Sequence, residues 1–434
     1  MHLHLTDHEK KLLSGHMGRL KQVAMENIVK FAEVVGAGRL CQVTKAHLYC
    51  GAHNYLKVCG SHDFHRIFTT MQLARPGEVI PFTEIDGGCF AQSDVSVSDF
   101  HQYESLGQSK AVFDENKHFL VMARQAGVAV VGTCAPYLTG WLPVAGEHFV
   151  STESSVTIVG NSLWGARGNS DGIEAAFWSA ICGRTPEFGL HLAENRGGTH
   201  HFKIEANLVE LPDWDLLGKA IGRVLPANAV PVLTGDFPKP DFNHLRQFLT
   251  SLAISSNAQL CHIVGLTPEA PTIEAAFKNV APQGEIRITN KDLSEAYELI
   301  SSPGEGPVDL VSLGCPHYDL SQIKAVAALL EGRRVHPGVK LMIWAPLSIK
   351  YLAEVNGLAQ IIEKAGGAIY AGSCPTTVGP CLLDPLRGLV FDSFKMAFSA
   401  KNMFSRPVYF GGPAQSLAAA EAGCWREEFR WQAK

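Results

Sequence analysis

The sequence predicts an α/β fold of several layers, built on parallel sheets that helices connect. Two observations indicate this class. After about Pro76, short runs of Val, Ile and Ala bounded by glycine alternate with longer amphipathic stretches, as in layered strands and helices. From about Val230 onward the order strand–helix–strand recurs, and helical crossovers of this kind connect parallel strands. We therefore expect a parallel sheet in the second half of the chain.

An amphipathic helix is expected first. Thr6 and Glu9 form the signature of a capping box, and apolar residues then recur at helical spacing until Gly36. Apolar runs bounded by glycine predict strands at residues 127–131, 230–233, 262–264, 308–313, 340–344 and 368–370. Between the last of these strands we expect two helices, at residues 319–332 and 348–366.

Length and composition describe a globular chain of two or three domains. The 434 residues are 46% apolar and 18% charged, which excludes a disordered or fibrous protein. The best boundary is a polar stretch rich in proline, between Pro212 and Pro240. We expect an N-terminal α/β region, 1–228, and a C-terminal α/β region, 229–434.

Charge and hydropathy exclude several classes of partner. The net charge is −5 and basic residues form no block, so a nucleic-acid partner is not expected. Apolar runs stay shorter than the roughly 18–20 residues that cross a bilayer. The N-terminal sequence MHLHLTDHEKK lacks the apolar core of a secretion signal, so we expect a cytoplasmic protein with reduced thiols.

Eleven cysteines are many for such a chain, and none of them forms a Cys-x-x-Cys motif. That spacing excludes the zinc ribbon, the thioredoxin motif and the ferredoxin run. Three cysteines instead share one pattern: an apolar strand, a glycine, the cysteine and a proline. They are Cys134, Cys315 and Cys374. Each is expected just beyond the carboxyl end of a strand, where open α/β sheets bind their ligands.

This repeated pattern has two interpretations. Cysteine is often buried, and strand ends often carry glycine and proline, so each site is compatible with an ordinary core residue. The repetition at three places favours three thiolate ligands of a metal centre with an open position. The cysteines expected in the core, because they lie in apolar stretches, are Cys41, Cys182 and Cys261. Further possible ligands in a region rich in Gly and His are Cys50, Cys59 and Cys89.

Polar side chains gather beside glycines between residues 134 and 202. They are Glu147, His148, Glu153, Ser154, Ser155, Asn161, Ser162, Arg167 and Asn169. Arg167 stands among glycines, an arrangement suited to clamping a carboxylate by paired hydrogen bonds. The alternative is a hydrogen-bonded loop whose arginine pairs with an internal Asp or Glu. Neither GxGxxG nor GxxxxGK[ST] occurs, which disfavours a nucleotide site.

These segments resemble the large, catalytic subunit of aconitase X, a divergent branch of the aconitase superfamily. The resemblance is carried by GTCAPY (132–137), PVAGEH (143–148), ESS (153–155), NSLWGARGN (161–169), GRTP (183–186), GLHLAENR (189–196) and GCPH (314–317), and it covers nearly the whole chain. It implies aconitase-like α/β domains and a dehydratase, a hydro-lyase, with an iron–sulfur centre. It also implies that Cys134, Cys315 and Cys374 are the ligands of that centre.

The resemblance further implies a small swivelling domain, either fused or separate. The chain has no room for that domain beyond the matched region, so we expect a separate small subunit in a heterodimer or larger assembly. Two segments differ from the family. After His47, an expected substrate-binding residue, the chain continues LYCGAHNY (48–55) in place of the usual glycine-containing substrate loop. Ser393 and Lys395 match a Ser-x-Lys segment with phenylalanine between them, although a helix start with a solvated lysine is the alternative.

The reaction implied is the removal of water from a carbon next to an acidic C–H. The iron centre would bind the leaving hydroxyl, a base would take the α-proton, and donors would hold the developing enolate. We expect Glu153, Ser154, Ser155, Asn161, Arg167 and Asn169 to bind substrate, with the carboxylate on Arg167 and Asn169. Ser393, activated by Lys395, is the expected base, and His148 is the alternative base.

The resemblance implies cis-3-hydroxy-L-proline or mevalonate 5-phosphate as the substrate, and we favour cis-3-hydroxy-L-proline or a close cyclic 3-hydroxy acid. The altered loop offers His53 but no Lys or Arg before Lys57, whereas a phosphate needs two or more cations or a helix N-terminus. Mevalonate 5-phosphate is the alternative substrate, with Lys45 or Arg196 as candidate phosphate ligands. The sequence is also compatible with an isomerase that rehydrates the alkene, and with a non-catalytic thiol-rich metal or redox protein.

Overall fold

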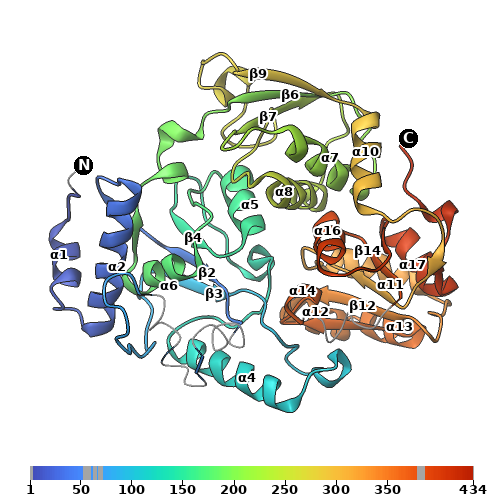
Figure 1. Ribbon diagram of the computed structural model, residues 1–434, viewed down its shortest axis with the longest axis horizontal. Helices are drawn as coiled ribbons and strands as arrows, with labels where there is room; N and C mark the ends of the chain where they lie inside the picture. Colours follow the sequence, from blue (N-terminus) through green and yellow to red (C-terminus); the bar gives the residue numbers. More distant parts are fainter. Residues whose placement is uncertain (1–2, 52–59, 62–65, 67–71, 379–386, 434) are drawn as a thin grey trace.

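The computed structural model describes residues 3–51, 60–61, 66, 72–378 and 387–433. Figure 1 shows its helices and strands arranged around parallel sheets, the first near the N-terminus, the second in the middle of the chain and the third toward the C-terminus. The predicted α/β class is confirmed. Cys59 and Cys381, and the residues His53 and Lys57 of the altered loop, lie outside the described residues.

Two helices rather than one open the described chain. They are α1 (Asp7–Leu13), which carries the expected capping box, and α2 (Arg19–Val35). Gly15 and Gly18 separate them with φ of 80° and 97°, a backbone conformation that ends a helix and suits glycine. The prediction of a single helix was wrong because the apolar spacing continues across this break.

The first sheet has the strand order β3-β2-β4, and its strands are parallel. These strands are β2 (Lys45–Leu48), β3 (Phe90–Ser93) and β4 (Phe149–Ser151), and an antiparallel pair is formed by β1 (Leu40–Gln42) and β5 (Arg184–Pro186). The helices of this region are α4 (Lys110–Gln125), α5 (Ser154–Trp164) and α6 (Ile173–Cys182). The strand expected at 127–131 is only a bridge between Ala129 and Gln92, because the hydroxyl of Ser93 rather than a backbone carbonyl accepts from the Val131 N–H.

The second sheet has the order β8-β7-β6-β9, again with parallel strands. Its strands are β6 (His200–Ile204), β7 (Pro231–Gly235), β8 (His262–Ile263) and β9 (Gly284–Ile288). Its helices are α7 (Leu211–Val224), α8 (Phe242–Ser256), α9 (Ile273–Ala276) and α10 (Asn290–Ile300). The domain division expected at residue 229 stays a prediction, and it falls between β6 and β7, which pair over five residues.

The third sheet is the parallel sheet expected in the second half, with the order β13-β12-β11-β14-β15. Its strands are β11 (Leu310–Leu313), β12 (Lys340–Ala345), β13 (Gly367–Ala371), β14 (Leu389–Phe391) and β15 (Val408–Phe410). Its helices are α11 (Leu320–Leu330), α12 (Leu347–Val355), α13 (Leu358–Ala365), α14 (Pro375–Val378), α16 (Phe394–Met403) and α17 (Pro413–Ala422). The helix expected at 348–366 is divided in two at Gly357, whose φ is 75°.

Shorter elements complete the described chain. They are the antiparallel pair β10 (Gly306–Pro307) and β16 (Cys424–Trp425), and the 3-10 turns η2 (Glu104–Leu106), η3 (Pro136–Thr139), η4 (Gly189–His191), η5 (Ala193–Arg196) and η6 (Glu427–Phe429). One buried apolar cluster joins the second sheet to the third, with Phe202 and Phe391 among its members. Another cluster packs α2 and α6 around the first sheet. Across the described ranges, each helix is too short or too polar to span a membrane.

Candidate active site

Three loops bring the singled-out cysteines to one place. Cys315 follows β11, Cys374 follows β13, and Cys134 follows the segment that is bridged to β3. The glycine that precedes each cysteine has a left-handed backbone, with φ of 59° at Gly132, 99° at Gly314 and 87° at Gly372. Residues with a side chain rarely adopt these values, so glycine is needed for the sharp turn before each cysteine. The predicted turn is confirmed at all three sites.

His317 links the three cysteine loops. Its Nε2 donates to the carbonyl of Ser373 at 3.0 Å, and its Nδ1 accepts from the hydroxyl of Thr133 at 3.0 Å. Burial lowers the pKa of His317 to about 4, so the ring is neutral and can play both roles. The sequence analysis names His317 only as part of the segment GCPH (314–317) and predicts no role for it. The signal that could have indicated its role is its position directly after Cys315 and Pro316.

The three thiols line one cavity of about 230 Å³. They are free cysteines, and Glu153 and Lys395 line the same cavity. The other lining residues are Tyr49, Asp94, Val95, Thr152, Ile173, Gly314, His317, Thr376 and Thr377. A larger cavity of about 900 Å³, lined in part by Tyr351 and Leu352 of α12, contains none of the predicted site residues.

Lys395 and Glu153 form an ion pair in this cavity, with 2.5 Å between Nζ and Oε1. Burial alone would raise the pKa of Glu153, but the Lys395 ammonium and the N–H and hydroxyl of Ser155 lower it to about 2. Burial also opposes the charge on Lys395, yet Glu153 and the thiols of Cys315 and Cys134 raise the pKa of its ammonium. The pair is therefore charged, and Lys395 is the only cation among the described residues that line the cavity.

Ser393 lies next to this cavity rather than on its lining. It is fully buried at the start of α16, where its hydroxyl accepts from the Met396 N–H at 3.4 Å. Burial raises the pKa of the Cys315 thiol to about 12, while Lys395 and a hydrogen bond with the Ser393 hydroxyl act in the opposite direction. Ser393 and Lys395 thus both act on Cys315, although the ammonium of Lys395 donates its hydrogen bond to Glu153.

His47 and Asp94 support the same region from the first sheet. The Nε2 of His47 donates to the carbonyl of Thr133 at 2.8 Å, directly before Cys134. Burial lowers the pKa of His47 to about 4, and it raises the pKa of Asp94, which Glu153 raises further. His47, expected to bind substrate, instead holds a cysteine loop. Asp94 was missed because no local motif surrounds it.

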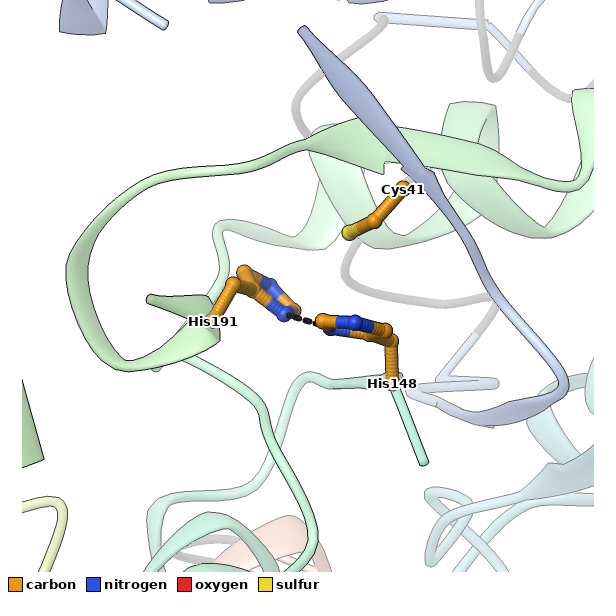
Figure 2. Close-up of side chains that lie close together, drawn as sticks. All are labelled: Cys41, His148 and His191. Carbon is orange, nitrogen blue, oxygen red and sulfur yellow. Dashed lines mark hydrogen bonds between the residues drawn. The ribbon is translucent and has the colours of Figure 1, made fainter. Parts of the chain in front are cut away.

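The structure places His148, Arg167 and Asn169 together, but not on the lining of the cysteine cavity. A hydrogen bond of 3.0 Å joins the Nδ1 atoms of His148 and His191, and Figure 2 shows the two rings facing each other. Arg167 donates to the carbonyl of His191 at 3.4 Å, and Asn169 donates to that of Phe188 at 3.2 Å. Arg167 and Asn169 each contact a backbone carbonyl of the segment 188–191 and do not line the cysteine cavity, so the expected carboxylate clamp stays a prediction.

The remaining predicted residues have structural contacts. Asn161 donates to the carbonyls of Gly168 and Gln259, both at 2.8 Å. Ser155 donates its N–H and hydroxyl to Glu153 at 3.2 and 3.0 Å, so it orients that carboxylate. Ser154 is the first residue of α5 and is half-buried. Of the expected substrate-binding set, Glu153 alone lines the cysteine cavity among the described residues.

The family models confirm the resemblance of the sequence to aconitase X. The first-domain model of aconitase X matches residues 2–194, the second-domain model residues 198–298, and the third-domain model residues 308–422. A cis-3-hydroxy-L-proline dehydratase of Pseudomonas aeruginosa is 30% identical over 419 residues, which cover 96% of this chain and 69% of that protein. The chain belongs to the aconitase X family. It is a hydro-lyase, a hydroxy-acid dehydratase of that family.

Other aconitase X proteins match over similar lengths. A phosphomevalonate dehydratase large subunit of Thermococcus kodakarensis is 30% identical, covering 91% of this chain and 94% of that subunit. A solved structure of Thermococcus kodakaraensis aconitase X in its holo form superposes with a TM-score of 0.78 at 26% identity, covering 94% of this chain and 97% of that one. These relatives do not support the hypothesis of a non-catalytic thiol-rich protein.

Proposed function

We propose that this aconitase X chain dehydrates cis-3-hydroxy-L-proline, or a close cyclic 3-hydroxy acid, in the cavity lined by Cys134, Cys315 and Cys374. One observation carries the proposal: three thiols from three separate loops share a small cavity with a charged lysine. Thiolates bind iron, and a lysine ammonium binds a substrate carboxylate by a charge-assisted hydrogen bond. In a hydroxy-acid dehydratase the first can activate the leaving hydroxyl and the second can hold the carboxylate.

The three thiols fit an iron–sulfur centre. Soft thiolates suit iron–sulfur clusters, and three ligands leave an iron position open. A single tetrahedral ion with bonds of about 2.3 Å would hold its sulfurs about 3.8 Å apart. The three sulfurs do not all lie within 4.8 Å of one another, which favours a cluster over a single ion. When bound there, such a centre would supply a Lewis acid for the leaving hydroxyl.

The residues of the chain would divide the remaining work. Lys395, held by Glu153, would neutralise the substrate carboxylate and stabilise the enolate that develops on loss of the α-proton. Ser393, buried against Cys315, would accept that proton, with the nearby ammonium favouring the negative form of its hydroxyl. Loss of the α-proton and the 3-hydroxyl gives water and an enamine, and the enamine tautomerises to a cyclic imine.

Mevalonate 5-phosphate is the second candidate substrate, because the chain spans 94% of a subunit named for that reaction and 69% of a hydroxyproline enzyme. The charges of the cavity argue for the unphosphorylated acid. Lys395 is the only cation on the described part of the lining, whereas a phosphate held by side chains needs two or more cations. The candidate phosphate ligands are engaged elsewhere: Lys45 pairs with Glu147 at 3.0 Å, and Arg196 with Glu269 at 2.5 Å.

A separate small subunit would complete the site. Relatives that match nearly end to end are named large subunits, which supports the existence of such a partner. Its closure over the cavity would exclude water from the reaction. A cytoplasmic location and reduced thiols are part of the same proposal, since iron–sulfur ligation requires free cysteines.

The test is an anaerobic assay of the chain purified together with its small subunit. Each candidate acid is offered separately, and the imine or the alkene is followed by mass and absorbance. We expect turnover of cis-3-hydroxy-L-proline and little of mevalonate 5-phosphate. Turnover of the phosphorylated acid alone would overturn the substrate proposal, and turnover of neither compound would overturn both candidates.

A further inference from the structure

A second cluster of metal-ligating side chains lies outside the cysteine cavity. Cys41 comes from β1, His148 directly precedes β4, and His191 ends η4. One donor atom from each side chain lies within 4.8 Å of the other two, and Figure 2 shows the sulfur of Cys41 beside the two facing rings. None of these residues lines the cysteine cavity.

The spacing of the two imidazoles matches that of metal ligands. The Nδ1 atoms of His148 and His191 are 3.0 Å apart. In a tetrahedral site with Zn–N bonds of about 2.0–2.1 Å, two nitrogen ligands are about 3.3 Å apart. A separation change of a few tenths of an ångström would therefore place both rings on one ion, and a thiolate at about 2.3 Å would complete a Cys-His-His face.

His191 supplies an independent indication of a ligand. Its side chain is fully buried, and its Nε2 has no hydrogen-bond partner among the described residues. Buried imidazole nitrogens are seldom left without a partner, because a buried polar group without a hydrogen bond is unfavourable. An ion can use either ring nitrogen of His191: on Nε2 it would satisfy this atom directly, and on Nδ1 it would leave Nε2 as an N–H donor for a further acceptor.

The electrostatic surroundings permit a cation. Burial lowers the pKa of His148, and it lowers that of His191 to about 3, so both rings are neutral and keep a lone pair for a metal. Burial raises the pKa of the Cys41 thiol, and the nearby carboxylates of Glu187 and Asp171 raise it further. A bound cation would favour the thiolate, and the Glu187 carboxylate, which also pairs with Arg39, would offset part of its charge. Burial raises the pKa of Asp171 to about 8, so that carboxyl contributes little, and Arg167, bonded to the His191 carbonyl, acts against the cation.

We propose that Cys41, His148 and His191 form a second metal site that binds Zn²⁺, or a divalent ion of similar ligand preference such as Co²⁺. The fourth position is left to water. The ion cross-links β1, the start of β4 and η4, and so fastens together three segments that lie far apart in the sequence. The site gives a ligand role to Cys41, which the sequence predicts in the core, and to His148, which the sequence predicts as the alternative base.

The test is a Co²⁺ titration of a chain whose other thiol site is removed by Cys134→Ser, Cys315→Ser and Cys374→Ser together. We expect one Co²⁺ per chain with a thiolate-to-cobalt absorption band. Adding Cys41→Ser or His191→Ala should weaken binding by at least about 100-fold, whereas adding Cys261→Ser, a buried cysteine elsewhere, should not. Equal binding with and without Cys41 would overturn the proposal.

X-ray absorption of the Zn²⁺-loaded wild-type chain gives a reading that does not depend on the folding of any variant. With the thiol cavity filled by its iron centre, we expect a first shell of one sulfur and two imidazole nitrogens. A shell without sulfur, or absence of bound zinc, would overturn the proposal. Either result leaves the dehydratase proposal unaffected, because none of these three ligands lines the cysteine cavity.

Discussion

Gly132→Ala should separate the loops of Cys134 and Cys374, two of the proposed cluster ligands. A Cβ at position 132 would lie 2.5 Å from the Cα of Gly372, a backbone atom that cannot rotate away. Reaching ordinary contact at 3.4 Å requires an opening of about 0.9 Å between the loops of Cys134 and Cys374. Ligand distances at a metal site tolerate only about 0.2 Å, so we expect the bound iron to be lost.

The stability cost of this substitution has two parts. The left-handed φ of 59° costs an alanine about 1 kcal/mol, and the overlap adds about 1–3 kcal/mol. Gly140→Ala is the matched control, because its φ is 91° and a Cβ there meets nothing within 4 Å. Thermal unfolding and iron content of both variants measure the difference. Equal iron and equal melting temperature in the two variants would refute the close-approach argument.

Three further predictions use single substitutions. Lys395→Gln should lower kcat/KM by a factor of about 10²–10³ while the iron is retained. Lys401→Gln, which changes an exposed lysine on the same helix, is the control and should leave kcat/KM unchanged. Equal activity in the two variants would refute the role of Lys395. His317→Ala removes the donor to the buried Ser373 carbonyl and the acceptor of the Thr133 hydroxyl proton, while the Thr133 oxygen still accepts from the Ala135 N–H. Denaturant unfolding should therefore show a loss of about 1–3 kcal/mol together with less iron, and wild-type stability would contradict the loop-tying role. Burial raises the pKa of Asp215 to about 7, so the native state keeps a proton that the unfolded state releases near pH 4. The contribution of Asp215 to the free energy of unfolding is therefore complete below about pH 4 and is lost by about pH 7. Between these values it falls by up to about 1.4 kcal/mol per pH unit. Asp215→Asn should flatten the pH dependence of unfolding between pH 4 and 7, and an unchanged slope would contradict the assignment.

The sharp turn before each of the three cysteines could be predicted because it depends on residues that are consecutive in the sequence. An apolar strand, a glycine and a cysteine specify the end of a strand and a sharp turn, and parallel strands bring such ends to one edge of a sheet. The breaks at Gly15 and Gly357 could not be predicted from apolar spacing, because the spacing runs on through both of them. The glycines themselves were the available signal, because glycine readily adopts the left-handed backbone that ends a helix.

The partners of charged groups depend on contacts that span the chain. Glu153 and Lys395 are 242 residues apart, and nothing near either residue indicates the other. Arg167 had the local composition of a carboxylate clamp, yet it bonds a backbone carbonyl of the segment 188–191. Composition identifies side chains able to bind an anion, whereas only the fold decides what each of them faces.

The ligand role of the three cysteines is tested most directly by iron content measured beside dehydratase activity. Cys134→Ser, Cys315→Ser and Cys374→Ser are purified anaerobically with the small subunit, and Cys182→Ser, a buried cysteine outside the cavity, is the control. We expect each of the three to lose the visible thiolate-to-iron absorption and at least about 10²-fold in activity, and the control to keep both. Full iron and full activity in all three variants would contradict the account.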